Sequence, residues 1–246
     1  MNPSTLVQAE LLLPHEIHAA LAANSVVYIP LGSIEYHSRH LPIGLDGLNA
    51  HGICTRAAQQ RGGIVLPTLY YGTGGGHTTY PWTIMATTQQ PLVELLETSL
   101  TRLAQFGVRI AVLFTGHFAD EQLVMIDDLA KRWNEGGSTL EVLPLSVSQT
   151  SAELAPDHAG VFETTLVAAL WPDRVQLDQL PSLVDAPAAD PPGSVGYDHR
   201  HDPEHPLWGV MGPDPRGSDL AKAASLLEHV VAWTSEQVER FRNRYA

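Results

Sequence analysis

The densest group of metal-capable side chains lies in residues 30–46, PLGSIEYHSRHLPIGLD, which hold Glu35, His37, His40 and Asp46. Side chains two positions apart in an extended segment point to the same side, so Glu35 and His37 can face one cavity. The two oxygens of the Asp46 carboxylate can bridge two cations. Oxygen and imidazole ligands together suit Zn²⁺, Mn²⁺ or Fe²⁺ rather than an all-thiolate site. The segment predicts a metal site, and a polar loop with a structural histidine is the alternative.

A second group follows another apolar run, in FTGHFADE at residues 114–121. His117 comes directly after that run, where a ligand can be presented at the edge of a sheet. A histidine in this position can equally be a hydrogen-bonding residue that binds no metal. Asp120 and Glu121 can be ligands or acids in the first turn of a helix, where the helix dipole stabilises them.

A third group, PDHAGVFETT at residues 156–165, contains Asp157, His158 and Glu163. It begins a helix-like stretch, so Glu163 is either a ligand or an acid at a helix N-terminus. His158 can orient a proton or polarise a substrate carbonyl.

The fourth group is glycine-rich: GTGGGHTTYPWT at residues 72–83. Glycines allow a backbone to approach a ligand closely, and His77 can contact a substrate or a partner subunit. A surface loop without such a role is the alternative. The run is neither a Walker A loop nor a dinucleotide fingerprint. The chain also lacks the G-x-S-x-G and HExxH motifs, which disfavours serine hydrolase and zincin mechanisms.

The elements that must position these groups alternate between strand and helix. Nearly continuous apolar runs predict strands that are covered on both faces, as in parallel sheets, at 25–32, 62–70, 109–116 and 139–146. Helices are predicted at 47–61, 91–106, 119–135, 160–171 and 217–244. This alternation favours a layered α/β fold, in which ligands bind at the carboxyl ends of the strands. The first, second and fourth groups follow three of these strands, which predicts one shared site.

Composition narrows the class of protein. The 246 residues carry a formal charge of −13 with only 14 lysines and arginines, which disfavours nucleic acids and anionic membranes as partners. The single cysteine, Cys54, excludes an intrachain disulfide. With neither a signal peptide pattern nor a membrane-length apolar run, we expect a cytoplasmic protein. We expect one domain over 1–246, with a Pro/Gly-rich excursion at about 181–217 that covers a site or contacts a subunit.

The ordered motifs resemble those of the creatininase (creatinine amidohydrolase) family. PLGSIEYHSRHLPIGLD is similar to P-x-G-S-x-E-x-H-G-x-H-L-P-x-x-x-D, and GHTTYPWT to H-x-x-F-P-G-T. TGHFAD is similar to N-G-H-x-x-N, and DHAGVFETT to H-A/G-G-x-x-E-T-S. The matches appear in the family's order over about residues 25–170.

The resemblance implies a three-layer α/β/α fold, often as a homohexamer, and two divalent metal ions per subunit that serve hydrolysis of an amide, commonly a cyclic one. Residues that match metal ligands are Glu35, His37, Asp46 and His117, with Asp46 as the bridge and a catalytic residue. His158 matches a catalytic residue that moves a proton or holds the small-molecule substrate. The residues expected to bind substrate are His77, Trp82 and Phe118.

Departures from the family pattern cluster around the pocket. Creatininase has a glutamate ligand at the position of Ala119, so we predict Glu163 as the fifth ligand, with Asp120 as the substitute. Trp82 replaces a glycine and Thr115 an asparagine, which predicts a reshaped pocket and argues against creatinine itself as the substrate. Isomerisation or other carbonyl chemistry on a sugar-like substrate, or ligand binding without turnover, are the alternatives to amide hydrolysis.

Overall fold

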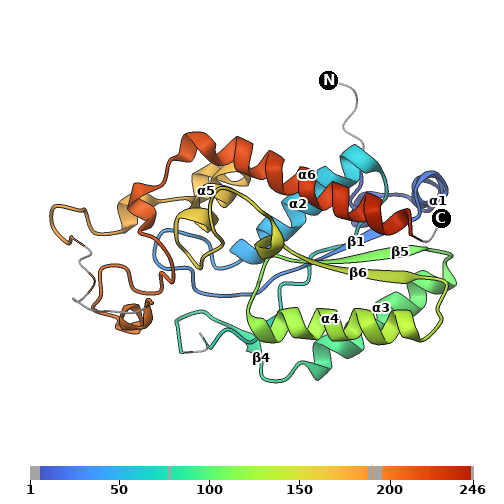
Figure 1. Cartoon of the computed structure of the whole chain (residues 1–246), viewed down its shortest axis with the longest axis horizontal. Helices are drawn as coiled ribbons and strands as arrows, with labels where there is room; N and C mark the ends of the chain where they lie inside the picture. The colour runs from blue at the N-terminus through green and yellow to red at the C-terminus, as the bar shows by residue number, and fades with distance from the viewer. Residues whose placement is uncertain (1–5, 77–78, 188–189, 191–195, 245–246) are drawn as a thin grey trace.

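The computed structural model describes residues 6–76, 79–187, 190 and 196–244, and is built around a four-stranded parallel sheet (Figure 1). The strand order is β2-β1-β5-β6. The strands are β1 (Val26–Leu31), β2 (Ile64–Val65), β5 (Ile110–Thr115) and β6 (Glu141–Ser146). In the centre of the sheet, Val27 of β1 pairs with Ala111 of β5.

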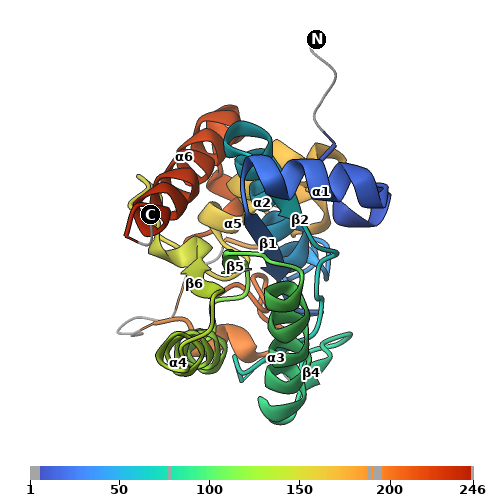
Figure 2. The same ribbon diagram turned by 90° about the vertical axis from the view of Figure 1, so that its right-hand side faces the viewer.

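Helices cover both faces of this sheet, which explains why the central strands are apolar at every position (Figure 2). Tyr28 packs on one face with Ile53 and Phe162, on the side of α2, α5 and α6. Its neighbour Val27 packs on the other face with Leu100 and Ile126, on the side of α3 and α4. The predicted α/β/α layers with a parallel central sheet are confirmed.

The helices agree with the ranges expected from the sequence to within two residues, except that the last begins at Ala223 rather than 217, and there is one additional helix. They are α1 (Pro14–Ala23), α2 (Leu45–Arg61), α3 (Gln90–Gln105), α4 (Asp120–Glu135), α5 (Val161–Leu170) and α6 (Ala223–Arg242). The sequence interpretation assigned no helix to α1, which has no fully buried residue and therefore gives a weak apolar signal. Pro14 and Glu16 stabilise its start, since Glu16 accepts the Leu13 N–H. No helix among the described residues has the length and apolar character that crossing a bilayer requires.

The second predicted strand, 62–70, is much shorter in the structure. Only Ile64–Val65 form β2, and Pro30 of β1, whose carbonyl faces this edge, has no N–H to donate to the ladder. The chain nevertheless continues beside β1, where Leu66 N–H donates to Tyr28 O and Leu69 N–H donates to Pro30 O. The glycine-rich segment then forms a separate two-stranded parallel sheet of β3 (Gly72–Thr73) and β4 (Met85–Ala86).

The described parts of the 181–217 excursion pack against the body of the protein. Arg200 is buried and donates to the carbonyls of Val210 and Gly212, at 3.3 and 2.7 Å. Met211 exchanges two backbone hydrogen bonds with His158. The excursion therefore forms a wall beside one of the predicted site residues.

Candidate metal centre

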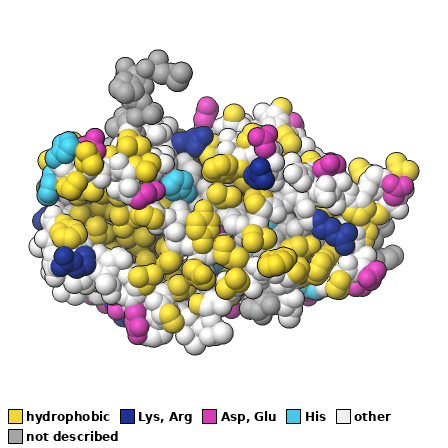
Figure 3. Space-filling model, turned by 180° about the vertical axis from the view of Figure 1, so that it is seen from behind, with side chains coloured by type: hydrophobic (Ala, Val, Ile, Leu, Met, Phe, Trp, Pro, Cys, Tyr) yellow, Lys and Arg dark blue, Asp and Glu magenta, His cyan; other side chains and the backbone are white. Residues whose placement is uncertain are grey.

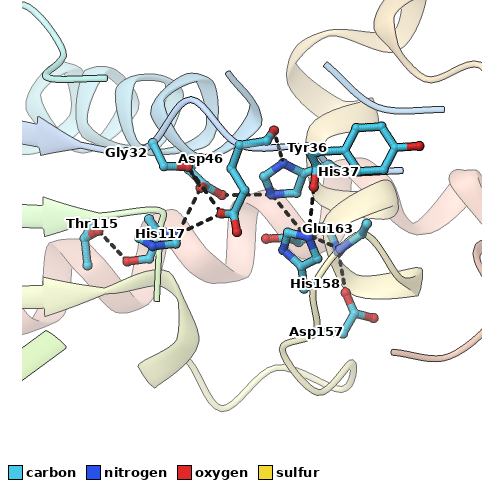
Figure 4. A network of polar contacts seen from close by, with 12 residues as sticks. Gly32, Tyr36, His37, Asp46, Thr115, His117, Asp157, His158 and Glu163 are labelled. Carbon is cyan, nitrogen blue, oxygen red and sulfur yellow. Dashed lines mark hydrogen bonds and ion pairs between the residues drawn. The ribbon is translucent and has the colours of Figure 1, made fainter. Parts of the chain in front are cut away.

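Five of the predicted site residues converge at the carboxyl end of the sheet (Figure 4). They are at most 5% exposed: Glu35, His37, Asp46, His117 and Glu163. Glu35 and His37 follow β1, and His117 follows β5. Asp46 and Glu163 lie in the first turns of α2 and α5. Residues far apart in the sequence thus meet where a parallel sheet is expected to bind its ligand.

Two glycines at the strand ends allow Asp46 to reach this position. A Cβ on Gly32, which follows β1, would overlap the backbone of Gly47. A Cβ on Gly116, which follows β5, would overlap the carbonyl of Asp46 itself. Because neither glycine has a side chain, the first turn of α2 lies directly across the ends of both central strands.

The Asp46 carboxylate joins two histidines. Its Oδ2 lies 3.2 Å from Nδ1 of His117, which is also 3.0 Å from Oε2 of Glu35. Its Oδ1 lies 3.3 Å from Nε2 of His37, which is also 3.5 Å from Oε2 of Glu163. The centre therefore contains two trios of one histidine and two carboxylates, with Asp46 common to both, and a further group brings Glu35 and His37 together with His158.

The outer nitrogens of the two histidines show that this arrangement suits cations. His37 Nδ1 donates to the Glu35 carbonyl at 2.9 Å, and His117 Nε2 donates to the Thr73 carbonyl at 3.2 Å. A carbonyl only accepts, so each outer nitrogen carries the proton of the neutral ring and each inner nitrogen has a lone pair. Each lone pair points at two carboxylate oxygens, an arrangement that a bound cation stabilises. His37 Nε2 is buried and has no hydrogen-bond partner among the described residues.

The charges of the buried side chains also favour bound cations at this centre. Burial alone would lower the pKa of His37, but the charges of Asp46 and Glu163 raise it to about 10. Burial raises the pKa of the Glu163 carboxyl well above its usual range, and Asp46 adds to the effect. The three buried carboxylates thus repel one another unless positive charge lies between them. Two divalent cations would supply that charge and outweigh the three carboxylates by one.

Ser33 is a centre residue that the sequence interpretation missed. Its hydroxyl approaches Asp46 Oδ2 closely and lies 3.3 Å from Glu35 Oε2. Ser33 lies two positions before Glu35, and the same-side spacing that linked Glu35 with His37 could have identified it.

His158 lies against the centre with a defined tautomer. Its ring centroid is 4.4 Å from that of His37, and its Nε2 donates to the Tyr36 carbonyl at 3.1 Å. The neutral ring therefore has its lone pair on Nδ1. Asp157 holds this turn at the start of α5, because its carboxylate accepts the N–H groups of Gly160 and Phe162 at 3.1 and 3.0 Å. Burial raises the pKa of Asp157 to about 6, although these backbone hydrogen bonds oppose the shift.

A cavity of about 280 Å³ opens onto the centre. Its lining includes four carboxylates, two histidines and one aromatic ring: Glu35, Asp46, Asp120, Glu163, His117, His158 and Phe118. None of its described lining residues is a lysine or arginine. Ala119 also lines the cavity, at the position where the resemblance predicted a missing glutamate.

The remaining predicted site residues that the structure describes lie at different distances from the centre. Glu163 belongs to one of the two trios, whereas Asp120 lines the cavity and joins neither. Trp82 is 77% exposed and lies outside the cavity lining. Its φ of 60° falls in the left-handed region that favours glycine, which agrees with the family's glycine at this position. His77 lies outside the described residues.

His40, from the same sequence segment, is buried outside both trios and bonds Thr164 Oγ1 through Nε2 at 2.9 Å. Burial, reinforced by His37, lowers its pKa from 6.5 to about 3. Between pH 6.5 and pH 3, His40 therefore binds a proton in the unfolded chain but not in the folded chain. The free energy of unfolding decreases as the pH is lowered through this range.

We expect this histidine to make wild type more acid-sensitive than a His40→Gln variant. Between pH 7 and pH 5 the wild-type free energy of unfolding should fall by about 2 kcal/mol more than that of the variant. Urea unfolding of both proteins over this range measures the difference. Parallel pH profiles would contradict the assignment.

Comparisons with known proteins agree with this geometry. A family model described as creatinine amidohydrolase matches residues 11–238. The chain is 32% identical over 234 residues to the creatinine amidohydrolase of Pseudomonas putida, with 85% of each chain covered. It is 29% identical over 171 residues to the mycofactocin precursor peptide peptidase of Mycolicibacterium smegmatis, covering 67% of this chain and 66% of that one.

Solved structures extend the similarity to the whole fold. A crystal structure of creatinine amidohydrolase matches with a TM-score of 0.74 at 27% identity, over 96% of this chain and 97% of that one. Similar structures include a manganese form of creatininase and a creatininase mutant of Zn–Zn type. Since the family model spans most of the sequence, the chain belongs to the creatinine amidohydrolase (creatininase) family.

Proposed function

We propose that this protein is a metal-dependent amidohydrolase that binds two divalent ions, such as Zn²⁺ or Mn²⁺. One ion would be held by Glu35, Asp46 and His117, and the other by His37, Asp46 and Glu163. The observation that carries the proposal is the shared Asp46 carboxylate, with one oxygen for each histidine lone pair. The Zn–Zn and manganese forms of similar creatininases support the choice of ions.

The residues around the ions would organise the reaction. A bound divalent ion polarises a carbonyl and lowers the pKa of a coordinated water. The Nδ1 atom of His158 would carry the proton that is transferred to the leaving nitrogen of the substrate, since Nε2 of His158 donates to the Tyr36 carbonyl. Asp157 would keep that ring in place through the turn at the start of α5. Phe118 would pack against the bound substrate, because it lines the cavity beside His117.

The cavity also limits the class of substrate. Asp120 adds a fourth carboxylate, and the described lining offers no lysine or arginine to pair with an anion. We therefore propose a small neutral or positively charged amide, with a cyclic amide as the first candidate. Trp82 is exposed outside the lining, so its contribution to substrate binding would require the substrate to extend beyond the cavity.

Assembly into a homo-oligomer, a hexamer by analogy with the family, remains part of the proposal. Figure 3 shows hydrophobic side chains spread over the face opposite to the view of Figure 1. Several large apolar side chains are more than half exposed, including Leu11, Leu13 and Phe106. Extended apolar surface of this kind is typical of contacts between subunits. The cytoplasmic location stays a prediction.

A substrate screen with the metal-loaded protein tests the proposed reaction. Purified chain would be stripped of metal, reloaded with Zn²⁺ or Mn²⁺, and assayed with cyclic amides, linear amides and keto-sugars. We expect metal-dependent release of the ring-opened product from a cyclic amide. Interconversion of keto-sugars without amide hydrolysis would favour the isomerase alternative. Tight ligand binding without turnover would favour the non-catalytic alternative.

A further inference from the structure

A closed ring of hydrogen bonds lies behind His117, outside the cavity. We infer that Gln122, in the first turn of α4, is a positioning residue that sets the orientation and tautomer of His117 for one of the two metal sites. The inference rests on the proposed function, since it assigns His117 to a metal ion. Gln122 is absent from the cavity lining, so it acts through other residues.

One side of the ring fixes the backbone of His117. The Thr115 hydroxyl donates its only hydrogen to the His117 carbonyl at 2.6 Å. It must therefore accept from Gln122 Nε2, which lies 2.8 Å away. The side-chain NH₂ of Gln122 thus donates to the end of β5, directly before His117, and it also lies 3.5 Å from the Gly32 carbonyl at the end of β1.

The other side of the ring fixes the imidazole. Gln122 Oε1 accepts the Thr73 N–H at 3.0 Å, and the Thr73 carbonyl accepts from His117 Nε2 at 3.2 Å. Thr73 belongs to β3, so a single amide side chain ties β3 to the end of β5. Holding the proton on Nε2 leaves the Nδ1 lone pair directed at Glu35 and Asp46.

The chemistry of the ring requires a neutral amide. Gln122 must donate to Thr115 and accept from Thr73 at once, which neither a carboxylate nor an apolar side chain can do. The residues of the ring are at most 5% exposed: Thr73, Thr115, His117 and Gln122. Water therefore cannot readily replace a lost hydrogen bond, and a broken ring should release the imidazole from its orientation.

Asn134 provides a matched control on the same helix. Its amide also donates and accepts, at 2.9 Å to Val142 O and 2.8 Å from Val142 N, and it holds β6 rather than β5. Substitution of Asn134 should destabilise the fold without altering the metal centre. Comparison of Gln122 variants with Asn134 variants therefore distinguishes a role in positioning His117 from a role in fold stability alone.

The experiment compares Gln122→Met and Gln122→Glu with Asn134→Leu and Asn134→Asp in the full-length chain. Zinc affinity is measured by competition with a chelator, and the coordination of bound Co²⁺ by its visible absorption. We expect the Gln122 variants to lose at least about tenfold affinity for one of the two ions, with an altered Co²⁺ spectrum. The Asn134 variants should keep wild-type affinity and spectrum, although their thermal midpoints fall. With a cyclic amide substrate, kcat should fall in the Gln122 variants more than KM rises.

Two outcomes would overturn the inference. Gln122 variants that bind both zinc ions with wild-type affinity would reduce Gln122 to a structural role and leave the proposed function intact. A wild-type chain that takes up no metal would overturn the inference together with the proposed function. Should the Gln122 variants fail to fold, Thr115→Val removes the hydroxyl of the ring and Thr115→Ser retains it. Loss of affinity in the valine variant alone supports the inference, and equal affinity in both contradicts it.

Discussion

Replacement of Asp46 by asparagine is expected to remove both metal ions and to lower kcat/KM by roughly 10³-fold or more, at the upper end of what loss of one electrostatic group costs. The two Asp46 oxygens face two different histidines, at 3.3 and 3.2 Å. An asparagine keeps one oxygen and turns an NH₂ group toward the other histidine, which excludes a cation there. Its neutral amide also removes the charge that holds two cations together.

The same change should not unfold the protein. Without metal, an asparagine removes both the repulsion between Asp46 and Glu163 and the attraction of Asp46 to His37, and it keeps the shape of the side chain. Metal content per chain and the thermal midpoint, measured on the same sample, separate the two effects. Asp128→Asn, the identical change on the exposed face of α4, is the control. An Asp46→Asn protein with two bound ions and wild-type activity would contradict the bridging role.

Replacement of Glu163 by glutamine is expected to remove one ion and leave the other. Glu163 faces His37 Nε2 at 3.5 Å and takes no part in the trio around His117. Its Oε2 also accepts the Ala159 N–H at 2.7 Å, a hydrogen bond that the glutamine oxygen can keep. The fold of the turn should therefore survive while the charge is lost. With one ion absent, we expect a fall in kcat of roughly 10²-fold or more.

Asp120→Asn is the matched comparison for this prediction, since Asp120 was the alternative fifth ligand. Asp120 lines the cavity but belongs to neither trio, so its variant should bind two ions. Elemental analysis of both variants after zinc loading gives the answer directly. One ion with Asp120→Asn and two with Glu163→Gln would exchange the roles of the two carboxylates.

The sequence predicted the parts of this site that depend on strand ends. Apolar runs identified β1 and β5, and a parallel sheet brings the residues after them to one edge, so the sequence alone was enough to group Glu35, His37 and His117. The residues alone offered Asp46 as a possible bridge and Glu163 as a possible ligand, and the family resemblance assigned these roles to them. The structure places all five residues in contact distance, while their roles as ligands remain predictions.

The supporting residues could not be predicted because their partners are set by packing. Gln122 and Thr73 are 49 positions apart, and His40 and Thr164 are 124 apart. No local pattern connects such pairs, since they meet only after α4 and α5 dock on the sheet. The crossing of α2 over Gly32 and Gly116 is similar: the glycines are visible in the sequence, but the backbone that needs their space is not.

Short elements without an apolar stripe were also beyond sequence reasoning. α1 has no buried residue, and it is recognised in the structure by its proline start and the Glu16 hydrogen bond. The β3–β4 pair involves only two residues in each strand, too few for a period to appear. Both lie outside the strongly apolar runs that define the central layers.

Counting the ions is the most direct test of a site in which one aspartate serves two histidines. The full-length chain, stripped and then incubated with excess Zn²⁺ or Mn²⁺, would be weighed intact by native mass spectrometry. The shared carboxylate predicts a mass increase of two ions for every chain present. A wild-type chain that binds no ion, and that gives the same mass spectrum as Asp46→Asn under the same conditions, would contradict the shared carboxylate site.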